Sequence, residues 1–193
     1  MMDFSGWRWL NEPDQWALNG SVLRVATNGK TDFWQRTWYG FQRHSGHVFG
    51  CDMRADFTLQ ARVRGDYRRL YDQAGLMVLK DHRHWLKAGI EYTDDQPMMG
   101  SVLTAPDSDW SSMPFAGDAG CFWLRLTLAD GCVRLQYSAD GKYWPLLRLC
   151  PFPSAPPWFA GVMCCTPERA GLTVAFDDIR LGKPQAKDLH DLT

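Results

Sequence analysis

The chain has 193 residues, 22% of them charged, and a formal net charge of −1 at pH 7. This length fits one domain with a single hydrophobic core. The balanced charge lacks the basic excess of proteins that bind nucleic acid or acidic lipid, and no segment approaches the ~20 apolar residues of a membrane helix. We therefore expect neither a nucleic-acid partner nor a membrane partner.

The six cysteines and the N-terminal residues predict a cytoplasmic protein. The cysteines show neither a Cys-x-x-Cys motif nor another metal-binding spacing, so we expect buried free thiols, no metal and no cofactor. Cys164 and Cys165 are adjacent in a predicted strand and should face opposite sides of a sheet. The first residues carry an acid early and contain no apolar run as long as that of a signal peptide.

Apolar and polar residues alternate along the first third of the chain, which is typical of strands. The pattern predicts strands within 1–20, over 21–27 and over 56–65. Residues 28–34 begin with an Asn-Gly turn signal and are interpreted as a loop. Residues 36–50 are dense in aromatic residues, His and Gly, so we expect a long connection with a strand near its end.

Residues 71–92 have the pattern of a β-hairpin whose second strand alternates strictly. The face that we expect to lie in the core carries Leu86, Ala88, Ile90 and Tyr92. The opposite face carries Trp85, Lys87, Gly89 and Glu91. An indole, an ammonium and a carboxylate in one row are unusual for a purely solvated face, so this face is the strongest candidate for a binding surface.

The second half of the chain continues with short strands and turn signals. The polar segment 105–114, which contains Trp110, is interpreted as a loop, and the Pro-rich segment 151–157 as irregular structure. The remaining strands are predicted over 98–104, 121–149 (two hairpins with Asp-Gly turns), 158–167 and 172–182.

This succession of short strands predicts an all-β fold, a two-sheet antiparallel β-sandwich of the jelly-roll type. We expect residues 1–183 to form the single sandwich domain and residues 184–193 to form a polar C-terminal tail. In such a sandwich, one curved sheet often presents a concave groove on its outer face, where a ligand binds.

Four stretches give the chain a specific resemblance to a known family: 31–50, 72–92, 124–144 and 172–181. They resemble the regulator-of-enolase-like family known as domain of unknown function 1349, and together they span nearly the whole chain. That family is similar in fold to the concanavalin A-like lectins and glucanases. The resemblance implies a jelly roll with a sugar-binding groove, and it brings no established activity.

Carbohydrate binding without chemistry is the first functional hypothesis. It requires aromatic rings that pack against a sugar ring and polar groups that bind its hydroxyls. A homodimer through an exposed sheet edge is also compatible with the pattern. For each tryptophan taken singly, a place in the core is at least as frequent as a ligand role. The candidate ligand-binding residues are Trp34, Trp38, Tyr39, Asp72, Gln73, Trp85, Lys87, Glu91 and Arg125.

Two other function classes stay open as alternatives. A glycoside hydrolase needs two carboxylates across a groove, and Glu91 is the candidate acid, although no partner acid shares its strand face. The simpler interpretation of Glu91 is an ion pair with Lys87 or a nearby Arg. The other class is a regulatory protein-interaction module, for which exposed aromatic residues such as Trp110 would form the partner surface.

Overall fold

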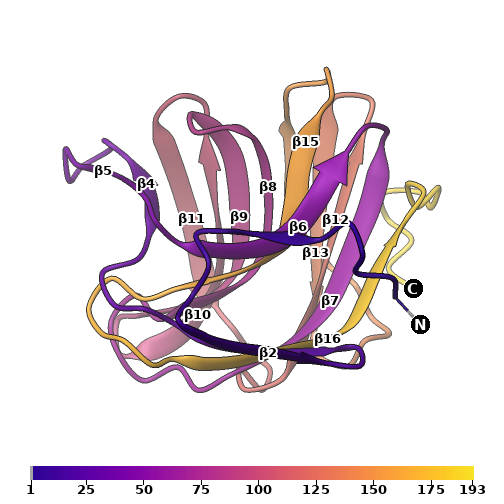
Figure 1. Cartoon of the computed structure of the whole chain (residues 1–193). Coiled ribbons are helices and arrows are strands. Elements are labelled where there is room, and N and C mark those ends of the chain that lie inside the picture. The colour runs from indigo at the N-terminus through magenta and orange to yellow at the C-terminus, as the bar shows by residue number, and fades with distance from the viewer. Residues whose placement is uncertain (1) are drawn as a thin grey trace.

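The computed structural model describes residues 2–193, which form sixteen β-strands and, within that range, no helix. Two seven-stranded antiparallel sheets pack face to face (Figure 1). Sheet I has the strand order β1-β6-β15-β8-β9-β10-β11 and sheet II the order β14-β13-β12-β7-β16-β3-β2. A separate hairpin of β4 (Phe33–Gln35) and β5 (Gln42–His44) projects beyond sheet I. The predicted fold class, a two-sheet antiparallel sandwich, is confirmed.

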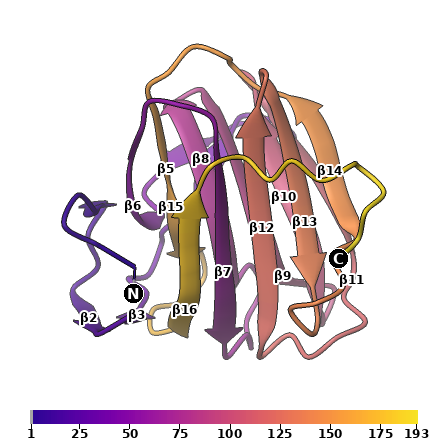
Figure 2. The ribbon, with the colours of Figure 1, turned by 90° about the vertical axis from the view of Figure 1, so that its right-hand side faces the viewer.

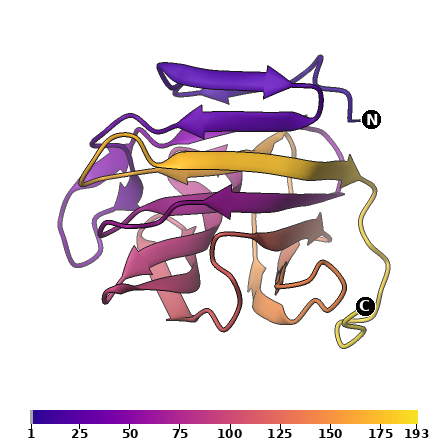
Figure 3. The same cartoon turned by 90° about the horizontal axis from the view of Figure 1, so that it is seen from below.

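The strands follow the sheet order closely in space. Figure 3 shows β16 running between β3 and β7, and both termini lie at one end of the sandwich. Sheet I consists of β1 (Arg8–Leu10), β6 (His47–Met53), β15 (Trp158–Cys165), β8 (Gln73–Asp81), β9 (His84–Thr93), β10 (Gln96–Thr104) and β11 (Ser108–Pro114). Sheet II consists of β14 (Leu146–Pro151), β13 (Cys132–Ser138), β12 (Phe122–Ala129), β7 (Phe57–Gly65), β16 (Thr173–Gly182), β3 (Val22–Ala26) and β2 (Gln15–Asn19).

Alternation places the apolar half of each strand between the sheets. Leu86, Ala88 and Ile90 of β9 belong to the main core together with Leu124 and Leu126 of β12, as the pattern predicts. A second apolar cluster lies on the outer face of sheet I, beneath β4. The adjacent thiols follow the same rule, because Cys164 packs in the main core and Cys165 in the second cluster.

The six cysteines are free thiols in the structure. In the described part of the chain, no helix is long and apolar enough to cross a membrane.

The prediction of a loop over 105–114 is wrong for most of that segment. Residues Ser108–Pro114 form β11, the edge strand of sheet I, which pairs with β10 over its whole length. Polar residues such as Asp are less frequent in strands than apolar ones. An edge strand, however, pairs on one side only and tolerates polar side chains on its exposed face. Pairing with β10 therefore decides the structure of this segment.

The C-terminal residues contact sheet II, and Figure 2 shows them crossing that sheet. The Arg134 side chain donates hydrogen bonds to the backbone carbonyls of Lys187 and Gln185 at 2.8 and 3.2 Å. The backbone N–H of Trp144 donates to the carbonyl of Leu192 at 2.8 Å. The tail thus covers part of the outer face of sheet II.

A row of three paired glycines leaves the centre of the outer face of sheet I without side chains. Gly75, Gly89 and Gly100 are directly paired across β8, β9 and β10. A Cβ atom at Gly89 would collide with the backbone carbonyl of Ala74. Because Gly89 has no side chain, space remains between Lys87 and Glu91 on the same strand face.

Candidate functional site

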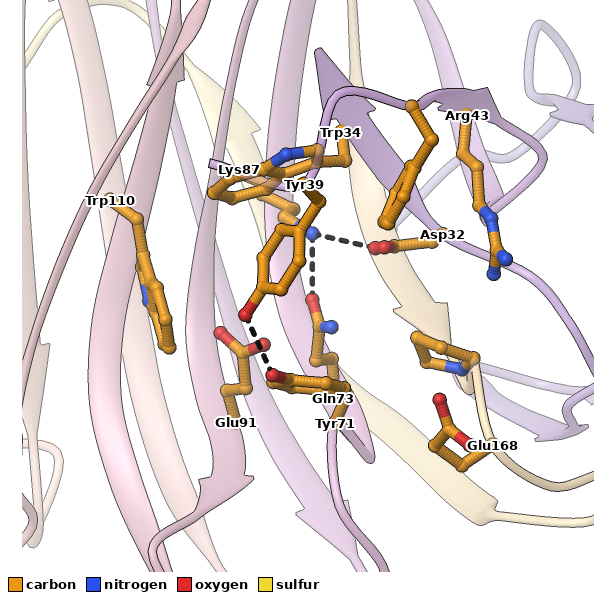
Figure 4. A pocket seen from close by; sticks show the side chains of 12 residues that line it. Asp32, Trp34, Tyr39, Arg43, Tyr71, Gln73, Lys87, Glu91, Trp110 and Glu168 are labelled. Atoms are coloured by element: carbon orange, nitrogen blue, oxygen red, sulfur yellow. Dashed lines mark hydrogen bonds and ion pairs between the residues drawn. The ribbon is translucent and has the colours of Figure 1, made fainter. Parts of the chain in front are cut away.

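A pocket of about 200 Å³ lies on the outer face of sheet I, at the side that the β4–β5 hairpin overhangs (Figure 4). We call it the Lys87 pocket. Its floor comes from β8 and β9, and the rest of its lining comes from the β4–β5 hairpin, β11 and three connecting segments. The pocket is lined by Asp32, Trp34, Tyr39, Phe41, Arg43, Tyr71, Gln73, Lys87, Glu91, Trp110, Pro167 and Glu168.

The floor is organised by the Lys87 ammonium, whose residue is 4% exposed. Lys87 Nζ donates to Asp32 Oδ1 at 3.0 Å and to Gln73 Oε1 at 2.8 Å. Asp32 Oδ1 also accepts from the N–H of Phe33, which fixes the carboxylate. An ammonium has three donors, so one N–H of Lys87 has no partner among the described residues.

The Lys87 ion pair is held in its charged form. Burial, the largest influence, disfavours the ammonium. The negative charges around it, that of Asp32 first and then those of Cys165 and Glu91, together with the Asp32 hydrogen bond, outweigh burial and raise the pKa of Lys87. A buried ion pair of this kind costs free energy to desolvate and is secure only when its partners are hydrogen-bonded. The Lys87–Asp32–Gln73 arrangement meets that condition and gives the floor a fixed geometry.

Glu91 lies four residues farther along β9, opposite Gln73 in the β8–β9 register. Among the described residues, its carboxylate has no hydrogen-bond or ion-pair partner. Burial raises the pKa of Glu91 to about 7, and the Lys87 charge only partly offsets that effect. Glu91 is therefore poised to gain or lose a proton close to neutral pH.

Aromatic rings form most of the pocket wall. Trp34 makes edge-to-face contacts with Tyr39 and with Trp110, at ring-centroid distances of 5.6 and 6.4 Å. The hydroxyls of Tyr39 and Tyr71 share a hydrogen bond of 2.8 Å, which joins the β4–β5 loop to the segment before β8. Figure 4 shows this tyrosine pair standing over the polar floor.

The pocket rim carries a cation and an acid. The guanidinium of Arg43 lies over the ring of Phe41, 4.8 Å from its centroid, and Tyr39 stacks on Phe41 from the same loop. Glu168, in the loop after β15, is exposed and also lines the pocket. The rim can therefore contribute charge of either sign to a bound molecule.

Five of the residues predicted from the sequence line this one pocket: Trp34, Tyr39, Gln73, Lys87 and Glu91. The structure brings them together from β4, the β4–β5 loop, β8 and β9. Trp34 is 7% exposed, and it both lines the pocket and packs in the second apolar cluster. Their role in ligand binding stays a prediction.

Trp85 does not offer the exposed platform predicted for it. It lies on the predicted face of β9, but its side chain is completely buried in the second apolar cluster. Phe33 covers it, with ring centroids 6.0 Å apart. The alternation rule gives the face of a residue correctly, but it contains no information about a distant segment that crosses that face.

Three other predicted residues lie outside the pocket lining. Asp72 is completely buried, pairs with Arg169, and accepts from two backbone N–H groups, so it anchors the β7–β8 connection. Arg125 belongs to β12 of sheet II, so it does not lie on the face of sheet I that carries Lys87 and Glu91. Trp38 is 92% exposed at the tip of the β4–β5 loop, beyond the pocket wall.

Sequence reasoning missed part of the lining. Asp32 directly precedes β4, and only the tertiary structure brings it to Lys87, 55 residues farther along the chain. Trp110, which the sequence predicts on a partner surface, lines the pocket because its segment is the edge strand β11. The remaining missed residues are Phe41, Arg43, Tyr71, Pro167 and Glu168. The clustering of aromatic residues around Trp34 was a local signal for Phe41, whereas Tyr71, Pro167 and Glu168 lie far from it in the sequence.

A metal-ion site finds no support in the geometry of residues 2–193, where no group of three or more His, Cys, Asp or Glu side chains is placed to hold an ion. His47, for example, is buried and hydrogen-bonded to backbone groups of Asn11 and Asn28.

Distant structures share the fold of the chain. The GH43 protein BlXynB from Bacillus licheniformis superposes with a TM-score of 0.73 at 15% identity, over 91% of this chain and 36% of that one. A legume lectin-like domain from Entamoeba histolytica superposes with a TM-score of 0.61 at 10% identity, over 93% and 91% of the two chains. These matches confirm the predicted lectin-like sandwich and show the fold alone.

Close relatives match nearly the whole chain. "Regulation of enolase protein 1" from Saccharomyces cerevisiae is 50% identical over 96% of this chain and 93% of its own length. The crystal structure of a functionally unknown protein from Saccharomyces cerevisiae matches with a TM-score of 0.93 and 48% identity, over 96% of this chain and 100% of that one. The pattern of one sequence family spans residues 9–184. The chain therefore belongs to the family described as "Protein of unknown function (DUF1349)".

Proposed function

We propose that this protein is a non-catalytic binding module that holds a carbohydrate, or a small polar ligand like it, in the Lys87 pocket. The observation that carries the proposal is the combination, in one pocket, of a fixed polar floor and aromatic walls. Small-ligand sites typically combine an apolar lining with a few convergent polar groups.

The floor supplies hydrogen-bonding groups suited to hydroxyls. Lys87 has one uncommitted N–H, and the Gln73 amide nitrogen has no partner among the described residues. Glu91 supplies acceptor oxygens on the same face. Because Lys87 and Asp32 hold each other in place, little conformational entropy is lost when a ligand binds to them.

The walls supply surfaces for the apolar faces of a sugar ring. Trp34, Trp110 and Tyr39 present rings from three different segments around one space. The pocket volume of about 200 Å³ lies below the roughly 300–1,000 Å³ of sites for drug-sized ligands. A single sugar unit is therefore the expected ligand size.

Calorimetric titration with a panel of hexoses, pentoses and disaccharides tests this proposal. We expect measurable heats for at least one monosaccharide, and a loss of at least ~10-fold in affinity for Trp110→Ala, because aromatic stacking is removed. Trp16→Ala is the matched control, since Trp16 lies on β2, outside the pocket. Flat heats across the panel, or equal losses in the two variants, would contradict the proposal.

A glycoside hydrolase is the second candidate, and the pKa of Glu91 favours it. A carboxyl group with a pKa of about 7 suits a general acid, and Asp32 and Glu168 also line the pocket. Asp32, however, is bound to Lys87. Aryl glycosides provide the test, with hydrolysis lost in Glu91→Gln as the expected result for an enzyme. Unchanged hydrolysis in that variant would remove Glu91 as the acid.

A regulatory interaction module is the third candidate, favoured by the name of the yeast relative. Trp38, 92% exposed on the β4–β5 loop, offers an anchor for a partner surface. Sedimentation of the chain with and without purified enolase tests direct contact, and sedimentation alone tests the proposed homodimer. An unchanged 22.1 kDa species would contradict both.

The free thiols support a further element of the proposal, a cytoplasmic location. Fractionation of cells that express the chain provides the measurement.

A further inference from the structure

Some charged groups of the Lys87 pocket have hydrogen-bond partners within the protein, and others do not. Lys87 and Asp32 bind each other at 3.0 Å, and Gln73 takes a second N–H of the ammonium. Glu91 lines the same space and has neither a hydrogen bond nor an ion pair among the described residues. Glu91 is half-buried, and a carboxylate that is partly shielded from water and has no partner favours an occupant that supplies a donor.

The surroundings of Glu91 are aromatic. Figure 4 shows its carboxylate between Trp110 on one side and the Tyr39–Tyr71 pair on the other. Aromatic faces attract cations through the ring quadrupole, and aromatic cages are a recurring way to recognise ammonium groups. A carboxylate within such a cage adds a charge-assisted hydrogen bond for an N–H donor.

We propose that the ligand of the Lys87 pocket is an amino sugar, whose primary ammonium group binds to Glu91 between Trp110 and the Tyr39–Tyr71 pair. This inference rests on the proposed carbohydrate-binding function and specifies its ligand class. The hydroxyls of the sugar then face Lys87 and Gln73 on the floor, four residues along β9 and across the β8–β9 register.

An anionic ligand fits the same charges less well. Three carboxylates, those of Asp32, Glu91 and Glu168, line the pocket with two cations. Of those cations, Lys87 is bound to Asp32 and only Arg43, over the Phe41 ring, is without an acidic partner among the described residues. A sugar acid would therefore meet like charge at Glu91 and Glu168.

Proton linkage gives the inference a second readout. Burial raises the pKa of Glu91 to about 7, so part of the population is protonated at neutral pH. An ammonium that binds to the ionised carboxylate lowers this pKa and releases a proton. The observed heat of binding should then depend on the ionisation enthalpy of the buffer.

The experiment compares glucosamine, galactosamine and mannosamine with their parent hexoses and their N-acetyl derivatives, by calorimetry at about pH 7 and by amide NMR. We expect at least one hexosamine to bind about tenfold or more tightly than its parent hexose and its uncharged N-acetyl form, with proton release. Glu91→Gln should abolish this preference, because the amide keeps the shape and removes the charge. Glu12→Gln, outside the pocket, is the matched control and should retain it.

Three results would overturn the inference, and they separate it from the function on which it rests. If a parent hexose binds as tightly as its hexosamine, the amino-sugar inference fails and carbohydrate binding stands. If Glu91→Gln retains the preference, the assigned ammonium site is wrong. If a folded wild-type chain, as judged by its NMR spectrum, binds none of the nine sugars, both proposals fail for hexose ligands.

Discussion

The outer faces of the two sheets each bury a tryptophan under a segment that belongs to neither sheet. On sheet I, Trp85 is completely buried beneath β4. On sheet II, Trp144 is 1% exposed, lies against Arg125 and is bound to Leu192 of the C-terminal tail. The two faces thus share their aromatic burial and differ in the partner of the neighbouring cation.

That difference decides which face has the features of a ligand site. Lys87 on sheet I pairs with the carboxylate of Asp32, and its pKa is raised although burial acts against it. Within residues 2–193, the side chain of Arg125 on sheet II donates only to the Gln60 amide oxygen, at 3.1 Å, and its guanidinium lies 3.7 Å from the Trp144 ring centroid. Burial, together with the charges of Arg134 and Arg180, lowers the pKa of Arg125 to about 10. An acid partner is what turns a buried cation into a fixed polar floor.

The largest expected difference between the two faces is in the loss of stability when the cation of each face is removed. Lys87→Met leaves the carboxylate of Asp32 buried without its counter-ion, and we expect a loss of about 3–5 kcal/mol in the free energy of unfolding. Arg125→Met leaves no buried acid behind and should cost about 1 kcal/mol, the value of a cation–π contact. Urea unfolding of both variants provides the measurement. Equal losses would show that the acid partner is not what distinguishes the two faces.

The pH dependence of stability should depend on Glu91. Its pKa rises from 4.5 to about 7 on folding, so the folded chain binds the proton more tightly than the unfolded chain. This contribution to stability is complete below about pH 4.5 and is lost as the pH rises through 7. Glu91→Gln should therefore be more stable than the wild type at about pH 8, by on the order of 2 kcal/mol, and equal to it at about pH 4.

Other titratable groups around Glu91 could also contribute to the pH dependence of stability, so the test needs a control variant. The measurement is the urea midpoint of unfolding between about pH 4 and about pH 8 for the wild type, Glu91→Gln and the control Glu12→Gln. Parallel curves for the wild type and Glu91→Gln would show that another group carries the pH dependence. The titratable groups around the carboxylate are Asp32, Tyr39, Arg43, Tyr71, Lys87, Cys165 and Glu168.

The smallest expected effect concerns the cover of sheet II. A chain that ends at residue 183 loses the carbonyl acceptors of Arg134 and the bond from Trp144 to Leu192. We expect a loss of about 1–2 kcal/mol in the free energy of unfolding and an increase in the solvent exposure of Trp144, measured by its fluorescence. Arg134→Ala should reproduce part of the loss. Unchanged stability would support the predicted boundary between the domain at 1–183 and an independent tail.

Local alternation was enough to predict the sandwich and the two faces of β9. Because successive side chains in a strand point to opposite sides, Lys87 and Glu91 had to share a face, and Cys164 and Cys165 had to separate. The same rule placed Leu86 in the core. These properties depend only on the chain within one strand, so the sequence by itself determines them.

Only the tertiary structure decided what covers each face. Trp85 is buried because β4 crosses it, Arg125 lies on the other sheet because β12 pairs with β7, and Trp110 reaches the pocket because β11 pairs with β10. Asp32 meets Lys87 across 55 residues of chain. Strand order and loop placement result from the summed burial and pairing of the whole chain, and a local pattern contains no record of them.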